Sequence, residues 1–227
     1  GLLESNQVDG AIFIGGKLVG SQLLRASFSK ENKIVLVNRL AEENFFTSVL
    51  TDYSQGVYKA VKHLYQQGFK KIALVCADDN NLIEEEKIKG YKEALNDFSL
   101  DLNNELIFSA ANGREGGYNV FLDITEGDII PDAFISTREL TTIGLVEAIK
   151  MGGYFIPDDF AVVGYGDNIL TSVIAPPLTV IAEPVKDLGN YSFEFLLELL
   201  NEDLESQQIK VLTPELIIRE SSISKYN

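Results

Sequence analysis

Glycine and charged residues follow several of the short apolar runs in this sequence, at the points where buried strands would end. One apolar run leads into Gly166 and Asp167, and an earlier one leads into Arg138 and Glu139. In an open parallel sheet, ligands bind outside the carboxyl ends of the strands. Charged side chains and bare backbone at such positions can hydrogen-bond a small polar molecule. The pattern favours a small-molecule site only modestly, because loops are polar in other proteins too.

Catalytic motifs are absent from the sequence. The only histidine, His63, falls in the middle of a predicted helix, and there is no G-x-S-x-G elbow, phosphate loop or dinucleotide-binding fingerprint. The only cysteine, Cys76, lies in an apolar run, so we expect a buried thiol and not a nucleophile or a metal ligand. We therefore expect a protein that is not an enzyme and that uses neither a metal nor another cofactor.

The composition indicates a folded, acidic protein. The chain has 227 residues, of which 45% are hydrophobic, and a formal net charge of −15. A surface this acidic repels nucleic-acid phosphates, so we do not expect these residues to contact DNA. No run approaches the ~20 apolar residues that a membrane-spanning helix needs, so we expect no membrane partner. The single thiol fits a reducing compartment.

Apolar runs alternate with helical patterns along most of the chain, which predicts an α/β fold with parallel sheets and right-handed crossovers. The acidic run at 84–86 is interpreted as a solvated helix N-terminus, favoured by the helix dipole. The predicted strands are 11–16, 33–39, 70–77, 104–110, 132–137, 160–165 and 212–222. The predicted helices are 18–30, 52–68, 83–98, 114–125, 140–152 and 185–201.

Five stretches of the chain stand out together: HLYQQGFKKIALV (63–75), KIKGYKEAL (87–95), PDAFISTRELTTIGLVEAIKMGGYFIPDDFAVVGYGDN (131–168), APPLTVIAEPVKDLG (175–189) and LTPELIIRESS (212–222). In this order they resemble segments of the lactose-repressor/galactose-repressor (LacI/GalR) family of transcription regulators. Each stretch alone is a weak signal, but five in register are specific.

The resemblance implies a two-lobed fold similar to type I periplasmic binding proteins, with parallel sheets flanked by helices and the effector between the lobes. It places residues 1–68 and 182–212 in an N-terminal lobe, and residues 69–181 and 213–227 in a C-terminal lobe. The chain begins where the second helix of that first lobe would be ending in the family. We therefore expect the N-terminal lobe to be incomplete in this chain, with further residues upstream in the native protein.

The resemblance also implies ligand-binding positions. Lys87 stands where the family has a cation that helps to hold the effector. Arg138 and Glu139 replace an asparagine and an aspartate that hydrogen-bond sugar hydroxyls. Gly166 replaces another sugar-binding aspartate, and Asp167 follows it, although successive residues of an extended chain point to opposite sides. The remaining implied positions are Ile14, Gln55, Asn112 and Glu183.

Two alternatives follow for the effector. In the first, which the presence of two cations favours, Lys87 and Arg138 bind an anion such as a phosphorylated sugar or a sugar acid. In the second, Arg138 pairs with a neighbouring carboxylate, for which Glu139 and Glu183 are candidates, and the site binds a neutral sugar or nothing.

The resemblance further implies the partners. We expect a cytoplasmic homodimer that contacts operator DNA only through an N-terminal helix-turn-helix absent from this chain, and whose lobes shift when a sugar or sugar phosphate binds. The alternative is a periplasmic sugar-binding protein of a transport system, which has the same fold. The P-P-L-T and R-E-S-S segments favour the regulator.

Overall fold

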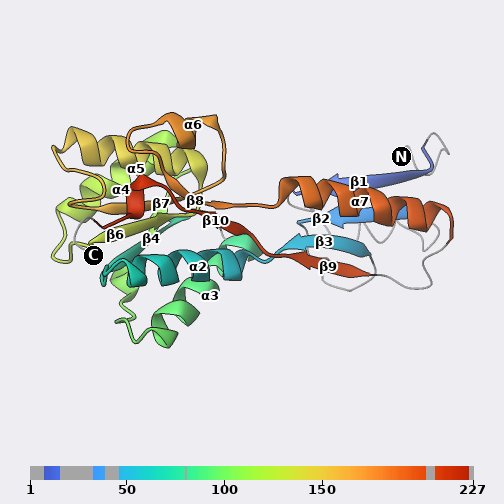
Figure 1. Ribbon diagram of the computed structural model, residues 1–227, viewed down its shortest axis with the longest axis horizontal. Helices are drawn as coiled ribbons and strands as arrows, with labels where there is room; N and C mark the ends of the chain where they lie inside the picture. Colours follow the sequence, from blue (N-terminus) through green and yellow to red (C-terminus); the bar gives the residue numbers. More distant parts are fainter. Residues whose placement is uncertain (1–7, 16–32, 39–45, 80, 203–207, 225–227) are drawn as a thin grey trace. The chain divides into compact units, whose positions relative to one another are not determined.

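The computed structural model describes residues 8–15, 33–38, 46–79, 81–202 and 208–224, and these form two compact units, each with its own sheet (Figure 1). Unit 1 comprises Gly1–Asp52 and Pro184–Thr213, and unit 2 comprises Tyr53–Glu183 and Pro214–Asn227. The α/β fold with parallel sheets and flanking helices that the sequence predicts is confirmed. Within the described residues, no helix combines the length and the apolar character needed to cross a membrane.

Unit 1 contains a parallel sheet in the order β1-β2-β3-β9. The helix α7 (Val185–Leu200) packs against this sheet, and Leu188 and Phe195 join the valines of β2 and β3 in its core. The predicted helix at 18–30 lies outside the described residues. The strands are β1 (Gly10–Ile14), β2 (Lys33–Val37), β3 (Thr47–Thr51) and β9 (Ile209–Leu212).

Unit 2 contains a sheet in the order β10-β8-β7-β6-β4-β5, in which only β10 runs antiparallel to its neighbour. The strands are β4 (Ile72–Ala77), β5 (Ile107–Ala110), β6 (Ala133–Ser136), β7 (Ala161–Tyr165), β8 (Thr179–Ala182) and β10 (Glu215–Ile217). The helices are α2 (Tyr53–Gln66), α3 (Leu82–Asp97), α4 (Arg114–Thr125), α5 (Glu139–Met151) and α6 (Ile169–Val173), with single 3-10 turns η1 (Asn104–Leu106) and η2 (Glu220–Ser222).

The central strands of unit 2 are buried on both faces, as their continuous apolar sequences predict. Alternate residues of β4 serve two cores: Leu74 and Cys76 pack with α2 and α3 on one face, whereas Val75 packs with α4 and α5 on the other. The buried thiol expected for Cys76 is confirmed. With helices on both faces, the carboxyl ends of the parallel strands form the edge where a ligand can approach.

The helices cross closely because glycines stand at the contacts. A Cβ on Gly90 would lie 2.0 Å from the carbonyl oxygen of Ser54, which fixes the approach of α3 to α2. A Cβ on Gly117 would lie 1.9 Å from the carbonyl oxygen of Thr141, which does the same for α4 and α5. These contacts set how closely α3 approaches α2 and α4 approaches α5, and the site residues lie at or near the starts of α3 and α5.

The boundaries between the compact units differ from the expected lobe boundaries by one or two residues at two crossings and by much more at the first crossing. The expected boundary near 68–69 would leave α2 with residues 1–68, whereas the structure divides the chain at Asp52 and Tyr53. The physical reason is packing, because α2 contacts α3 extensively and contributes Val57 and Leu64 to the core around β4. The predicted strand at 212–222 is divided as well, because Pro214 separates β9 from β10 and the segment ends in η2.

Candidate functional site

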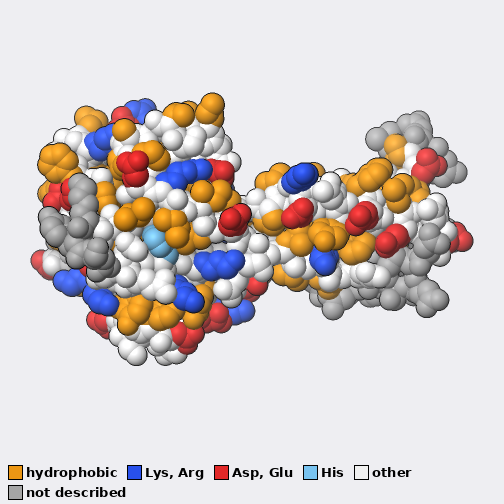
Figure 2. Space-filling model, in the orientation of Figure 1, with side chains coloured by type: hydrophobic (Ala, Val, Ile, Leu, Met, Phe, Trp, Pro, Cys, Tyr) orange, Lys and Arg blue, Asp and Glu red, His pale blue; other side chains and the backbone are white. Residues whose placement is uncertain are grey.

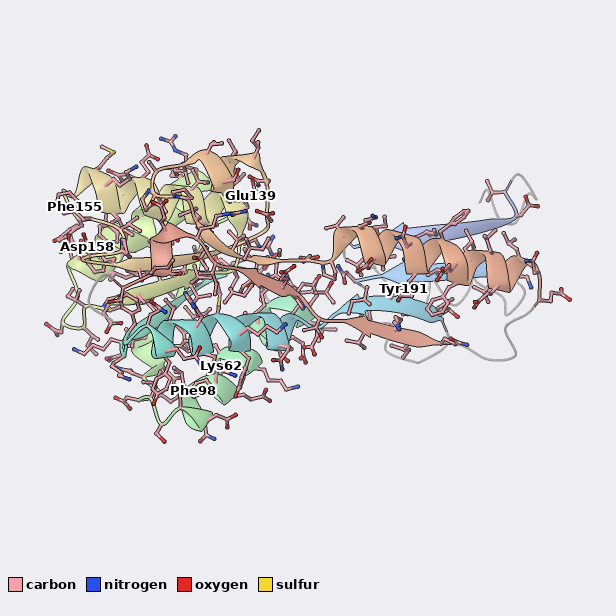
Figure 3. All side chains as sticks on the ribbon, in the orientation of Figure 1. Lys62, Phe98, Glu139, Phe155, Asp158 and Tyr191 are labelled. Carbon is pink, nitrogen blue, oxygen red and sulfur yellow. The ribbon has the colours of Figure 1, made fainter. Side chains whose placement is uncertain are left out.

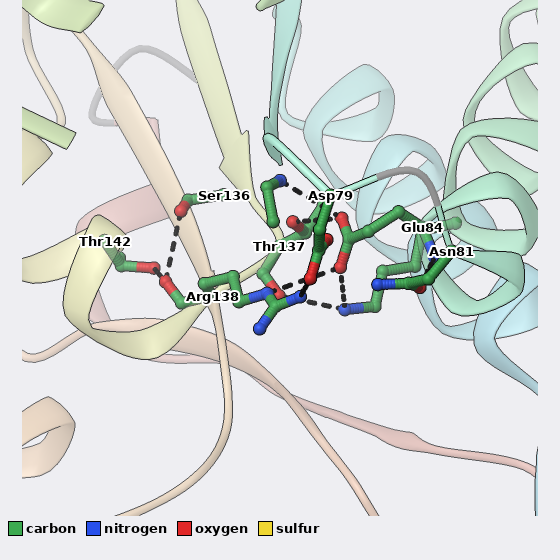
Figure 4. A network of polar contacts seen from close by, with 9 residues as sticks. Asp79, Asn81, Glu84, Ser136, Thr137, Arg138 and Thr142 are labelled. Carbon is green, nitrogen blue, oxygen red and sulfur yellow. Dashed lines mark hydrogen bonds and ion pairs between the residues drawn. The ribbon is translucent and has the colours of Figure 1, made fainter. Parts of the chain in front are cut away.

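The carboxyl edge of the unit 2 sheet carries a charged network around Glu84, Thr137 and Arg138 (Figure 4), and the buried Lys87 of α3 belongs to it. The Lys87 Nζ donates to Glu84 Oε1 at 3.1 Å and to the carbonyl oxygen of Thr137 at 3.0 Å. Thr137 follows β6, so the lysine links α3 to the neighbouring strand end. Only 4% of Lys87 is exposed, and this burial lowers the pKa of its ammonium against the opposing effect of Glu84.

Glu84 is the buried anion at the centre of this network. Its carboxylate accepts from Thr137 Oγ1 at 2.7 Å and from the Ala77 backbone N–H at 3.3 Å, as well as from Lys87. Asn81 caps α3 and accepts from the Glu84 backbone N–H at 3.0 Å, which starts the helix so that Glu84 turns inward. The interpretation of 84–86 as a solvated helix N-terminus is therefore wrong for Glu84, which is only 3% exposed.

Arg138 joins the network from the start of α5. Its Nη2 lies 2.8 and 3.0 Å from the two carboxylate oxygens of Asp79, which follows β4, and its Nε lies 3.5 Å from Glu84 Oε1. This pair is more open to solvent than the Lys87–Glu84 pair: the side chains of Arg138 and Asp79 are 37% and 24% exposed. We call Asp79, Glu84, Lys87, Thr137 and Arg138 the Lys87 network.

Tyr165 lies against this network at the end of β7. Lys87 Nζ lies 4.1 Å from the centre of the Tyr165 ring and 5.5 Å from that of Tyr53, within cation–π range. The phenol oxygen of Tyr165 is buried and has no hydrogen-bond partner within the described part of the chain. Burial, with the negative charge of Glu183 as the next contribution, raises the pKa of this phenol far above its ordinary value.

Gly166 and Glu139 lie beside one another at the same edge. Gly166 has φ of +88°, a left-handed conformation that favours glycine, and its N–H already donates to the Ile181 carbonyl oxygen at 2.9 Å. Glu139 is the first residue of α5 (Figure 3), and its Oε2 lies 3.6 Å from the position that a Cβ at 166 would take. The carboxylate at 139 therefore lies next to the place where a side chain at 166 would begin.

Asp167 turns toward the C-terminal segment. Its Oδ1 accepts from Arg219 Nη2 at 2.6 Å, and Arg219 Nη1 also donates to the Leu178 carbonyl oxygen at 2.9 Å. The sequence suggests the Asp167 carboxylate as a substitute for the aspartate that the family has at position 166. In the structure it is paired with Arg219 instead.

The structure brings five of the expected site residues to one edge of unit 2. Lys87 and Arg138 share Glu84, Glu139 adjoins Gly166, and the charge of Glu183 acts on Lys87. The structure places the remaining positions as follows: Asp167 is paired with Arg219, Asn112 is exposed in the turn between β5 and α4, Gln55 is half-buried in the first turn of α2, and Ile14 is 78% exposed at the end of β1 in unit 1.

Three residues that the sequence did not place in the site belong to it: Asp79, Glu84 and Thr137. The available signal was spacing, because Glu84 precedes Lys87 by three residues and faces it on a helix. Asp79 and Thr137 each follow a buried strand, as do the residues that the sequence did single out. From the sequence, Glu139 and Glu183 are the candidate counter-charges for the two cations. In the structure, Glu84 contacts Lys87 directly, and Asp79 contacts Arg138 directly.

This arrangement is suited to binding. In the described residues, no three histidine, cysteine or acidic side chains group in a way that could hold a metal ion. Burial raises the pKa of the Cys76 thiol to about 12, so this thiol is not a nucleophile at neutral pH. His63 Nε2 lies 2.8 Å from Ser222 Oγ, but the serine is fully buried, which denies a substrate access to that pair.

Known proteins resemble this chain over most of its length. Residues 61–222 match the periplasmic binding protein-like domain family. The HTH-type transcriptional repressor PurR of Haemophilus influenzae (strain ATCC 51907 / DSM 11121 / KW20 / Rd) is 29% identical over 225 residues, which are 97% of this chain and 66% of PurR. The NTD biosynthesis operon regulator NtdR of Bacillus subtilis (strain 168) is 30% identical over 223 residues, which are 97% of this chain and 67% of NtdR.

A solved structure extends the likeness to three dimensions. A LacI-family transcriptional regulator from Enterococcus faecium with bound ribose matches with a TM-score of 0.84 at 25% identity, covering 97% of this chain and 82% of that one. The chain spans about two thirds of the length of the curated regulators that it matches. The chain belongs to the periplasmic binding protein-like family and, within it, to the LacI-family transcriptional regulators.

Proposed function

We propose that this chain is the effector-binding part of a transcription regulator and that a small, carbohydrate-like molecule binds at the carboxyl edge of unit 2. The observation that supports this is the Glu139 carboxylate beside the bare backbone of Gly166, with no ion pair or hydrogen bond within the described residues. A carboxylate oxygen accepts hydrogen bonds from hydroxyl groups. The E. faecium neighbour contains bound ribose, which makes pentoses the first candidates.

Calorimetric titration with a panel of uncharged mono- and disaccharides, ribose among them, tests this function. Binding to at least one sugar is expected. Glu139→Gln weakens that binding by roughly tenfold or more, because a hydrogen bond to a charged group is worth about 1.5–3 kcal/mol.

Glu115→Gln is the matched control, because Glu115 is exposed in the first turn of α4, where its carboxylate experiences a similar helix dipole. It should bind the sugar as tightly as the unchanged protein. Equal binding by the unchanged protein and Glu139→Gln contradicts the role given to Glu139, and no binding to any sugar contradicts the carbohydrate effector.

The remaining partners are a second copy of the chain, in the cytoplasm, and operator DNA that is contacted by a helix-turn-helix outside this sequence. The net charge of −15 supports DNA contact through other residues than these, because an acidic surface repels nucleic-acid phosphates. Exposed apolar side chains on α7, Phe193 and Leu197 among them, support a homodimer, and hydrophobic side chains are visible between the charged ones over unit 1 (Figure 2). Sedimentation of the chain with duplex DNA should show a dimer that carries no DNA. A monomer contradicts the proposed homodimer. A complex with DNA contradicts the proposal that DNA is contacted only outside this sequence.

A further inference from the structure

Both cations at the carboxyl edge of unit 2 already hold carboxylates of the protein. Lys87 lies 3.1 Å from Glu84, and Arg138 Nη2 lies 2.8 Å from Asp79. Each cation is thus neutralised before any ligand arrives. The alternative in which these cations bind an anionic effector requires that at least one internal carboxylate be displaced.

The two pairs differ in their accessibility to a ligand. The side chains of Lys87 and Glu84 are 5% and 4% exposed, so this pair is part of the interior. Arg138 is 37% exposed, and it is therefore the cation that a ligand meets first. Two carboxylates restrict how a ligand can approach this guanidinium, because Asp79 contacts Nη2 and Glu84 lies 3.5 Å from Nε.

Further negative charge surrounds this position. Glu139 follows Arg138 directly and has no ion pair within the described residues, and the charge of Glu183 acts on Lys87 and Tyr165. A ligand anion that approaches Arg138 would therefore meet carboxylates that outnumber the cations. These carboxylates would repel the ligand anion, and the repulsion is stronger beside a buried ion pair than in bulk water.

Stability alone does not account for the Arg138–Asp79 pair. Partly exposed ion pairs contribute little to folding, commonly about 0–1 kcal/mol. Asp79 accepts hydrogen bonds from Arg138, which links the end of β4 to the start of α5, and the Nε of that guanidinium lies 3.5 Å from the buried Glu84. Its position suits control over which ligand Arg138 can accept.

We propose that Asp79 is a specificity-determining residue: by holding Arg138, it excludes anionic ligands from this edge and restricts the site to uncharged, hydroxyl-bearing ligands. This inference rests on the proposed function, because it concerns the ligand of the same site. It selects the neutral sugar from the two alternatives that the sequence left open. It also predicts that removal of one carboxylate is enough to admit an anion.

Calorimetric titration with three probes tests the proposal: inorganic phosphate, ribose 5-phosphate and ribose. The unchanged protein should bind both phosphate compounds only weakly, and more weakly than ribose. Asp79→Asn keeps the size of the side chain but removes the negative charge that neutralises Arg138, and should gain affinity for both phosphate compounds by roughly tenfold to a hundredfold, the range for one hydrogen bond to a charged group. Glu86→Gln removes an exposed carboxylate that pairs with Lys89 on the same helix, α3, and should gain no affinity for phosphate.

Two results would overturn the proposal. One is tighter binding of ribose 5-phosphate than of ribose by the unchanged protein. The other is an Asp79→Asn protein that is folded, as shown by its circular dichroism, and binds phosphate no better than Glu86→Gln does. If Asp79→Asn does not fold, Asp79→Ser removes the same charge with a smaller side chain. Because inorganic phosphate reports on Arg138 directly, this arm stays decisive for Asp79 even if no sugar binds and the carbohydrate effector is abandoned.

Discussion

Two buried polar networks lie in unit 2, and they differ in whether the protein alone completes them. The Lys87 network is charged and lies at the carboxyl edge of the sheet. The second, which we call the His63 network, consists of His63, Thr179, Ser221 and Ser222 and connects η2 to α2 and β8. In the described chain, Arg138 Nε within the Lys87 network and Tyr165 Oη beside it are buried without a hydrogen bond, whereas no side-chain atom of the His63 network is.

In the His63 network, each hydroxyl has hydrogen-bond partners, and the contacts define which group donates and which accepts. Ser222 Oγ donates to Thr179 Oγ1 at 2.6 Å, and Thr179 Oγ1 donates to the Arg219 carbonyl oxygen at 3.0 Å. Ser222 Oγ is therefore left to accept from His63 Nε2–H, which defines the tautomer of the imidazole. A completed network of neutral groups is suited to fixing a chain segment, in this case η2, to the sheet.

The incomplete network is the one that lies where a ligand binds in folds of this kind. Buried polar atoms without partners are rare in folded proteins, and each carries a cost of about 1–3 kcal/mol. Of the two networks, the one with missing partners therefore lies where a ligand can supply them, although Thr51 Oγ1 and Thr141 Oγ1, outside both networks, are also buried without a hydrogen bond within the described residues. The predictions below test whether the two networks differ in this way.

The largest expected effect comes from the anion of the Lys87 network. Glu84→Gln preserves the shape of the side chain but leaves Lys87 buried without a counter-charge, so the free energy of unfolding should fall by about 3–5 kcal/mol. Urea denaturation measures this change. Glu85→Gln, which is exposed in the same helical turn, should stay within about 0.5 kcal/mol of the unchanged protein.

A double variant sharpens this result. In Glu84→Gln combined with Lys87→Met, no charge is left unpaired at this position, so much of the lost stability should return. If Glu84→Gln and Glu85→Gln lose equal stability, the Lys87 network does not hold a buried charge pair.

The sequence predicts those parts of the fold that depend on local pattern. Strands β4, β6 and β7 are apolar apart from Gly164 and the terminal Ser136, and the structure buries every one of their residues. Strand β3, with the sequence TSVLT, was not predicted, because its polar threonines and serine give no apolar run. The predicted strand at 212–222 ignored Pro214, which has no N–H to donate and stands where β9 gives way to β10.

The charge partners in the site could not be predicted, because they depend on residues far apart in the sequence. Glu84 is buried because Thr137 follows a strand beside β4, and this contact exists only after β4 and β6 pair. The pairing of Asp167 with Arg219 requires the C-terminal segment to lie beside β8. Resemblance to a family identifies positions, but the partner of each charge follows from the three-dimensional packing.

A smaller, pH-dependent effect is expected in the His63 network. Burial lowers the pKa of His63 in the folded protein below the ~6.5 of an exposed histidine. As the pH falls below this unfolded-state value, the unfolded chain therefore takes up a proton before the folded chain does. The stability contributed by neutral His63 is fully present above the unfolded-state pKa and is lost as the pH falls toward the folded-state pKa.

Urea denaturation of the unchanged protein and of His63→Gln between pH 7.5 and 5 measures this effect, because His63 is the only histidine in the chain. The difference in stability between the two proteins should shrink as the pH falls. A difference that is constant over this range would mean that His63 titrates as it does in the unfolded chain. Sugar binding by His63→Gln should stay at the level of the unchanged protein, since the His63 network does not reach the carboxyl edge.

The smallest expected effect compares a buried phenol that has a hydrogen-bond partner with one beside the Lys87 network that has none, and each variant removes a single oxygen. Tyr91 Oη donates to the Ile72 carbonyl oxygen at 2.7 Å, whereas the buried Tyr165 Oη has no partner within the described residues. Tyr91→Phe should therefore lower the free energy of unfolding by about 1 kcal/mol, while Tyr165→Phe should leave it unchanged or slightly raised, because it removes a buried group that gains nothing in the folded state. If the missing partner of Tyr165 is a ligand hydroxyl, Tyr165→Phe should also weaken sugar binding, and Tyr91→Phe should not. Equal losses of stability in both variants would show that Tyr165 has a partner in solution, such as a bound water, and the contrast between a completed and an incomplete network would then fail at this residue.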